Sequence, residues 1–219
     1  KDVDEAKAVM HSFAEKGYLA SGNRGTNYLF VDANGKILQI ADNCYKIIEE
    51  QVNPSLKKDG KEYKGIYFTV SRVNDYGSPE DALISNYGNI TIELANSPKV
   101  SKHPAMWNFE RAQSSTTILI DPEYPETLTT IFVTLPAYGY SIPFLMGANA
   151  TPRALMDGTV YEKQRTSFEY SEFYEAGIND MWRKFIYGVR AQLKEGKDVQ
   201  EELNENFLKM VNFVLSMNE

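Results

Sequence analysis

The sequence predicts an α+β protein of a single domain, with helices at both ends of the chain and β-strands between them. Apolar residues recur at helical spacing near the start and along the tail. The middle holds short runs of β-branched and aromatic residues, which favour strands. An Asn-Gly pair between two such runs is the clearest local signal, because both residues tolerate the positive φ that hairpin turns require. No internal repeat, low-complexity tract or long linker divides the 219 residues.

The first element is predicted to be a helix that ends near Gly17. Asp2 or Asp4 can accept hydrogen bonds from the N–H groups of the first turn, and glycine readily takes the left-handed conformation that ends helices. The predicted core face carries four apolar side chains, namely Val3, Ala6, Met10 and Phe13.

A hairpin is predicted from residues 27–31 and 36–41, on either side of the Asn-Gly turn. Residues 44–52 fit either a short helix or an outer strand. A polar, Lys-rich loop is expected from 53 to 62.

Further strands are expected over residues 65–71 and 89–94, followed by a strand pair over 116–121 and 128–135. Residues 136–168 contain many Pro and Gly and show no clear period, so they are expected to form a long wrapping segment.

The tail predicts two amphipathic helices, over residues 171–194 and 198–217, which Gly196 separates. Their apolar residues recur at helical spacing, as expected for helices that pack on a sheet.

The charge balance argues against a nucleic-acid partner. The chain has 23 Lys and Arg against 30 Asp and Glu, a net charge of −7, and no basic cluster. Phosphate binding requires a concentrated positive surface. No run of about 18 apolar residues is present, so no membrane span is expected. The single cysteine, Cys44, excludes an internal disulfide and a cysteine-rich zinc site.

Motifs that carry chemistry are scarce. The sequence has no phosphate-binding glycine loop, no H-E-x-x-H and no G-x-S-x-G. His11 and His103 lie far apart and are interpreted as structural. Cys44 follows a predicted strand, where it is either a small buried residue or the nucleophile of an unrelated thiol enzyme. Residues 136–144 place three aromatic rings in a Gly/Pro frame, which predicts either part of a cleft or ordinary packing.

Several segments, read in order, resemble the later part of an N-terminal-nucleophile hydrolase of the penicillin acylase, bile-salt hydrolase and isopenicillin-N acyltransferase type. The first helix and residues 25–35 (GTNYLFVDANG) are similar to the family's helix, G-x-N-Y, strand, D-x-x-G, strand passage. Residues 65–71 (GIYFTVS) resemble the strand that ends beside the active site. Residues 114–122, 129–135 and 140–145 (YSIPFL) are similar to the closing strand pair and its exit.

The resemblance implies an αββα sandwich, with two antiparallel sheets between helical layers, that acts on amide bonds. The family's nucleophile is usually a Cys freed at a chain N-terminus, whose own α-amino group is the base. No metal and no cofactor are expected. Residue 1 is Lys, so the nucleophile is expected from residues outside this chain, on a second chain of the same precursor. Substrates would be small amides or peptides.

The resemblance also implies site residues. It places Ser71 where the family has an amide that stabilises the oxyanion, and Asn74 is the other candidate for that role. Arg72 is a candidate to stabilise a developing charge or to bind a substrate carboxylate, and Arg111, in the region where some relatives have an arginine, is a candidate for substrate binding. Independently of the resemblance, Tyr138 and Tyr140 of the Gly/Pro-framed aromatic segment are candidates for the pocket wall.

Two rival interpretations remain open at the level of sequence. One is the thiol enzyme that uses Cys44, and the other is a binding module that has the sandwich fold but no nucleophile. The compartment is not fixed; a secreted or periplasmic location is favoured because the chain begins like a processed product.

Overall fold

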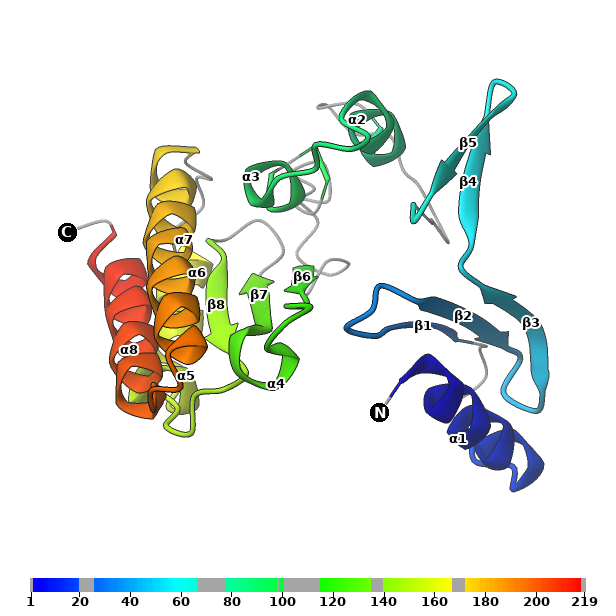
Figure 1. Ribbon diagram of the computed structural model, residues 1–219, viewed down its shortest axis with the longest axis horizontal. Coiled ribbons are helices and arrows are strands. Elements are labelled where there is room, and N and C mark those ends of the chain that lie inside the picture. Colours follow the sequence, from blue (N-terminus) through cyan, green and yellow to red (C-terminus); the bar gives the residue numbers. More distant parts are fainter. Residues whose placement is uncertain are drawn as a thin grey trace. The chain divides into compact units, whose positions relative to one another are not determined.

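The structure is a computed structural model of an α+β fold, and its described residues form three small antiparallel sheets (Figure 1). The chain forms two compact units, residues 1–71 and 72–219, and each is described by itself. The residues described are 2–19, 26–66, 78–97, 99–100, 115–134, 140–166 and 172–217.

The first unit contains a three-stranded sheet in the order β1-β2-β3, made of Asn27–Val31, Ile37–Asp42 and Ile47–Val52. The predicted hairpin is confirmed as β1 and β2. The carboxylate of Asp32 accepts hydrogen bonds from the backbone N–H groups of Asn34 (2.9 Å) and Lys36 (3.0 Å), which fixes the turn. Of the two structures open for residues 44–52, the outer strand is the one observed.

Helix α1, Val3–Glu15, packs on this sheet. Asp2 caps it as predicted, because its carboxylate accepts the N–H groups of Asp4 and Glu5, both at 3.0 Å. Gly17 has the expected left-handed conformation, with φ of +71°. The predicted core face is correct for Val3 and Met10 but wrong for Phe13, whose side chain is 43% exposed.

The predicted loop over residues 53–62 is wrong. These residues belong to a second hairpin, with β4 at Ser55–Lys58 and β5 at Lys61–Lys64. Asp59 and Gly60 form its turn with φ of 50° and 74°, and two consecutive positive φ angles are typical of a tight two-residue hairpin turn. The strands carry lysines in place of an apolar face, which hides them from a hydrophobicity pattern.

The second unit contains a sheet in the order β6-β7-β8, made of Ser115–Leu119, Thr130–Thr134 and Ile142–Leu145. The predicted strand pair is confirmed as β6 and β7, which the short helix α4, Pro125–Leu128, connects.

The expectation of a wrapping segment over residues 136–168 is wrong for its described part. That part contains β8 and two short helices, α5 at Arg153–Met156 and α6 at Thr159–Thr166.

The predicted strand over residues 89–94 is also wrong. After α2, Pro79–Ser85, the chain forms a short helix α3, Ile92–Ala95. The hydroxyl of Thr91 accepts the backbone N–H of Leu94 at 3.3 Å, so an N-cap overrides the β-branched composition.

The two tail helices are confirmed as α7, Glu172–Lys194, and α8, Gln200–Ser216. They form the core of the second unit together with residues of β8 and its flanks, including Tyr140, Ile142, Leu145, Ile178, Phe185, Val189, Leu203, Phe207, Met210 and Val214. Gly196 lies between them with φ of +73°.

Beyond Ile66, the predicted strand over residues 65–71 lies outside the described part of the chain. The single-domain organisation stays a prediction. Within the described ranges, no helix combines the length and apolar composition that crossing a bilayer requires.

Candidate functional site

Five of the six predicted site residues lie outside the described part of the chain. They are Ser71, Arg72, Asn74, Arg111 and Tyr138. Their predicted roles are therefore untested by the geometry.

Tyr140 is the described member of this set, and it lies two residues before β8. Its side chain is 4% exposed, and its ring meets that of Tyr174 on α7 edge to face, with the centroids 5.8 Å apart. Tyr140 is thus part of the core of the second unit, and its predicted place in a pocket wall stays a prediction.

Buried polar side chains gather next to Tyr140. We refer to Asn96, Ser141, Glu175 and Asn179 as the Glu175 cluster; each is buried. The backbone N–H of Ser141 donates to Glu175 Oε2 at 3.2 Å, and Asn96 Nδ2 donates to Asn179 Oδ1 at 3.3 Å. Burying a carboxylate costs free energy, so such a group is expected where it has a structural or chemical role.

The helical repeat of α7 places this cluster. Glu175 and Asn179 are four residues apart and therefore lie on the same face of the helix. Trp182 lies nearly one turn further, where its indole N–H donates to Thr130 Oγ1 of β7 at 2.9 Å and its ring meets Phe132 edge to face. This face of α7 thus brings polar groups to three places, namely the segment before β8, the end of α3 and strand β7.

Among the described residues, three ion pairs join α7 to segments outside it, and Lys194 makes one of them, with its Nζ 3.4 Å from Glu123 Oε2. Arg183 pairs with Glu93 of α3, and Arg190 pairs with Asp121, which follows β6. Burial alone raises the pKa of the Asp121 carboxyl, but the N–H of Tyr124, the guanidinium of Arg190 and the N–H of Glu123 outweigh it, and the pKa is lowered. Asp121 is therefore held as a charged, structural carboxylate.

A second buried carboxylate lies in the first unit, at Asp42. Its Oδ1 accepts the backbone N–H groups of Cys44 at 2.8 Å and Thr26 at 3.3 Å. Its Oδ2 has no hydrogen-bond partner within the part of the chain described. The pKa of the nearby Tyr28 hydroxyl is raised, mainly by burial. The interaction of this hydroxyl with Asp42 also raises its pKa, whereas the side-chain hydrogen bond with Thr26 lowers it.

Cys44 is half-buried in the turn between β2 and β3, and its φ is 72°. A left-handed conformation is unusual for a residue with a side chain. The predicted alternatives for its thiol, a buried side chain or a nucleophile, stay open.

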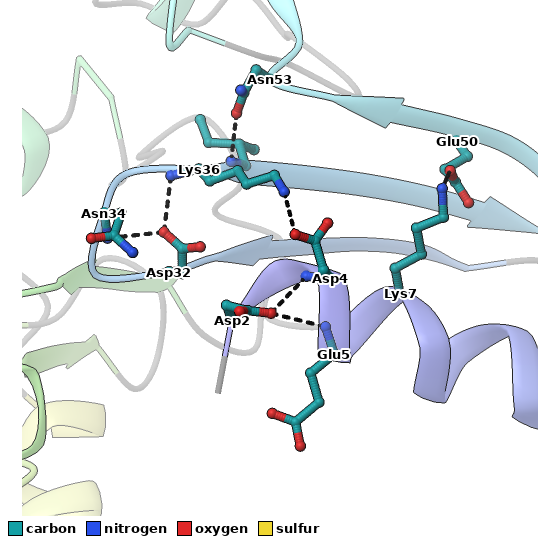
Figure 2. A network of polar contacts seen from close by, with 10 residues as sticks. Asp2, Asp4, Glu5, Lys7, Asp32, Asn34, Lys36, Glu50 and Asn53 are labelled. Atoms are coloured by element: carbon teal, nitrogen blue, oxygen red, sulfur yellow. Dashed lines mark hydrogen bonds and ion pairs between the residues drawn. The ribbon is translucent and has the colours of Figure 1, made fainter.

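A network of charged side chains joins α1 to its sheet (Figure 2). Lys7 pairs with Glu50 of β3, and Lys36 Nζ lies 2.6 Å from Asp4 Oδ2. His11 Nε2 also lies 2.7 Å from Glu50 Oε2, which agrees with the structural interpretation of this histidine. The side-chain hydrogen bonds from Lys7 and His11 lower the pKa of Glu50, although burial opposes them. The other histidine, His103, lies outside the described residues.

Among the residues described, no three His, Cys, Asp or Glu side chains gather as a metal ion would require. The buried carboxylates and amides can form hydrogen bonds. Among them are those of Asp42 in the first unit and of the Glu175 cluster in the second.

The sequence interpretation missed Glu175, Asn179 and Asp42. A readable signal existed for the first two, because they occupy core-facing positions of a predicted amphipathic helix where apolar residues are expected. Asp42 is the last residue of β2, directly after the strand predicted over residues 36–41, and it had no comparable signal.

No protein-family model, curated protein or solved structure matches the chain.

Proposed function

We propose that this chain is the C-terminal portion of an amide-bond hydrolase or acyltransferase of the N-terminal-nucleophile class. The proposed fold is an αββα sandwich of two antiparallel sheets between helical layers. The proposal starts from the resemblance of the segments, and the order of elements agrees with it: a helix, a tight hairpin, a closing strand pair, a further strand and a helical tail.

The observation that carries the proposal is the same pairing of layers in both units. Helix α1 packs on the β1-β2-β3 sheet through Val3 and Met10. Helices α7 and α8 pack on the β6-β7-β8 sheet through contacts such as Trp182 with Phe132 and Phe207 with Phe144. A helix that packs on an antiparallel sheet is the basic pair of layers from which the proposed sandwich would be built.

In the proposed reaction, the thiol of an N-terminal Cys supplied by a second chain attacks the carbonyl carbon of the amide. The thiol proton passes to the α-amino group of the same residue, whose pKa is about 8 in model peptides. The ammonium gives this proton to the leaving nitrogen as the C–N bond breaks, which leaves a thioester. Water or an amine then attacks the thioester, the C–S bond breaks, and the thiol is restored.

The residues of this chain would stabilise the oxyanion and bind the substrate. Ser71 or Asn74 is proposed to donate to the oxyanion, an effect of about 3 kcal/mol for one donor. Arg72 and Arg111 are proposed to bind a carboxylate of the substrate. Tyr138 and Tyr140 are proposed to line the pocket.

The Glu175 cluster supports the proposed role of the segment around Tyr140 as part of the pocket wall. Glu175 accepts the backbone N–H of Ser141, the residue that follows Tyr140, and Tyr174 packs on the ring of Tyr140. Helix α7 therefore fixes the backbone and the ring at one end of the proposed wall. A wall fixed in this way binds a substrate without losing side-chain entropy.

The proposal is tested with protein purified from its native source together with any chain that accompanies it. The preparation is incubated with a panel of N-acyl amines and N-acyl amino acids, and the amine released is measured. We expect the amine to be released, and we expect iodoacetamide to stop this release by labelling an N-terminal Cys. A Cys44→Ser variant should be as active as the unaltered protein.

Two results would contradict the proposal. Amine release that disappears in Cys44→Ser would indicate the unrelated thiol enzyme. No release from any amide of the panel would favour a binding module that has the sandwich but no chemistry.

A further inference from the structure

Gln39, in the middle of β2, is a buried side chain whose amide makes no hydrogen bond to the described residues. Its exposed fraction is 0%, and neither Nε2 nor Oε1 has a partner among them. The amide offers two N–H donors and one acceptor oxygen, and buried groups of this kind are normally paired. Leaving them unpaired opposes folding, so this position indicates a partner that the described residues do not supply.

The side chain of Gln39 lies on the face of the sheet opposite α1. Its neighbours in sequence, Leu38 and Ile40, belong to the core cluster that packs with α1. Successive side chains of a strand point to opposite faces, so Gln39 points away from the helix. Directly across from it in the ladder, and therefore on the same face, are Leu29 of β1 and Gln51 of β3.

Apolar side chains beside Gln39 are exposed on this face. Leu29 and Val31 are two residues apart in β1, so both lie on the same face as Gln39, and both are exposed. We refer to Leu29, Val31 and Gln39 as the Gln39 face. Exposed apolar side chains that gather beside a buried polar group are typical of a surface that another segment covers.

The free oxygen of Asp42 is a weaker indication of a missing partner. Asp42 lies two residues beyond Ile40 in β2, and therefore on the face that α1 covers. Its Oδ1 already accepts two backbone N–H groups, and the hydroxyl of Tyr28 interacts with the carboxylate. Groups of this chain thus stabilise the Asp42 side chain, whereas the amide of Gln39 has no hydrogen bond to the described residues.

We infer that the Gln39 face binds the nucleophile-bearing chain of the precursor, and that the amide of Gln39 pairs with backbone groups of that chain. The inference rests on the proposed function, which requires such a chain. A backbone peptide offers the N–H and the C=O that Oε1 and Nε2 of Gln39 need. The exposed side chains of Leu29 and Val31 provide apolar contact area beside this polar pair.

The enclosure of Gln39 distinguishes this partner from a diffusing ligand. A fully buried side chain is out of reach of a substrate in solution. Two chains cut from one precursor fold together before they are separated, so a segment of one is built into the interior beside the other. Internal water is the other partner small enough to reach such a position, and it is the alternative outcome of the experiments.

The place of the second chain is tested by photocrosslinking in protein purified with every chain of its precursor. In Leu29→benzoylphenylalanine, light should join this chain to a chain that begins with Cys. Val9→benzoylphenylalanine is the control, because Val9 is exposed on α1, which covers the other face. A second chain that is present but does not cross-link from Leu29, or that cross-links equally from Val9, would overturn the inference and leave the proposed function standing.

The role of the amide is tested with Gln39→Met in the same preparation, because methionine keeps the volume of the side chain and removes its hydrogen-bonding atoms. In size-exclusion chromatography, this variant should release the second chain at a lower urea concentration than the unaltered protein. Gln51→Met is the matched control and should show no shift, since Gln51 is exposed and its Nε2 already donates to Glu49 Oε1 at 2.6 Å.

Two results would overturn the inference in different ways. Release of the second chain at the same urea concentration in Gln39→Met and the unaltered protein would assign the amide to an internal role with water as its partner. If Gln39→Met does not assemble, the cross-link from Leu29 decides, because Gln39 is intact in that protein. Absence of any chain that begins with Cys from the unaltered protein would refute the proposed function and this inference together.

Discussion

At the scale of single residues, buried carboxylates that accept backbone N–H groups are the most informative feature of this chain. Glu175, Asp121 and Asp42 are all buried, and each accepts at least one backbone hydrogen bond. An N–H that loses its partner inside a protein is costly, so these positions are sensitive to substitution.

Glu175→Ala is expected to lower the free energy of unfolding by about 1–3 kcal/mol, because the buried N–H of Ser141 loses its acceptor. Glu175→Gln keeps a carbonyl acceptor and is expected to lose less than Glu175→Ala. Urea unfolding of the three proteins measures both effects. Equal midpoints for Glu175→Ala and the unaltered protein would show that this hydrogen bond does not stabilise the fold.

Asp121→Asn is expected to lower the free energy of unfolding by about 1.5–3 kcal/mol at pH 7, since the charged hydrogen bond to Arg190 is lost. The pKa of Asp121 is lowered in the folded protein. Its contribution to stability is therefore present above the unfolded pKa, about 3.9, and is lost as the pH falls through the folded value.

In urea unfolding, Asp121→Asn and the unaltered protein should accordingly differ in free energy of unfolding at pH 7. This difference should shrink as the pH falls below about 4. Asp180→Asn is the matched control, because Asp180 is exposed and pairs only with Lys184 four residues along α7 among the described residues. Its effect should stay below about 0.5 kcal/mol. A loss in Asp121→Asn that is the same at pH 7 and pH 3 would contradict the assignment.

At the scale of elements, the tail helices stabilise the second unit through their buried faces. Phe207→Ala should cost roughly 3–5 kcal/mol, as should Phe185→Ala, because both side chains are buried in the core. Leu208→Ala is the control next to Phe207, since Leu208 is 47% exposed. Denaturant midpoints that do not change in either phenylalanine variant would mean that this core is wrongly assigned.

Two glycines of α7 allow a comparison within one helix. A Cβ at Gly188 meets nothing within 4 Å, so Gly188→Ala should raise the free energy of unfolding by about 0.5–1 kcal/mol through its helix propensity. A Cβ at Gly177 would lie 2.9 Å from Cζ of Phe213, so the ring must move. In thermal unfolding, Gly177→Ala should therefore raise the stability less than Gly188→Ala does. A larger increase for Gly177→Ala would contradict this packing.

The elements predicted correctly from the sequence are those whose signals are local and strong. The Asn-Gly turn, the Asp2 cap and the long apolar stripes of α7 and α8 each determine structure within one segment. The β4-β5 hairpin was missed because its strands lack an apolar face, although Asp59 and Gly60 mark its turn. Helix α3 was missed because the N-cap hydrogen bond to Thr91 outweighs the strand preference of Ile90 and Ile92.

At the scale of the whole molecule, the candidate site was less predictable than the elements. A site gathers residues that are distant in sequence, and only tertiary structure brings Asn96 to Asn179, or Ser141 to Glu175. Sequence spacing did place Glu175 and Asn179 on one helix face. It gave no means of knowing that a loop before β8 and a helix after α2 meet that face.

The two units also differ in charge. Residues 1–71 carry equal numbers of basic and acidic side chains, so the net charge of −7 belongs to residues 72–219. The predicted absence of a nucleic-acid partner thus rests mainly on the second unit, while the first unit is electrically neutral as a whole.

The central claim is that this chain works with a nucleophile carried by a second chain of the same precursor. The most direct test is the intact mass and N-terminal sequence of every chain in the protein purified from its native source. We predict a co-purifying chain that begins with Cys. A single uncut chain with no Cys, Ser or Thr at its N-terminus would contradict the account.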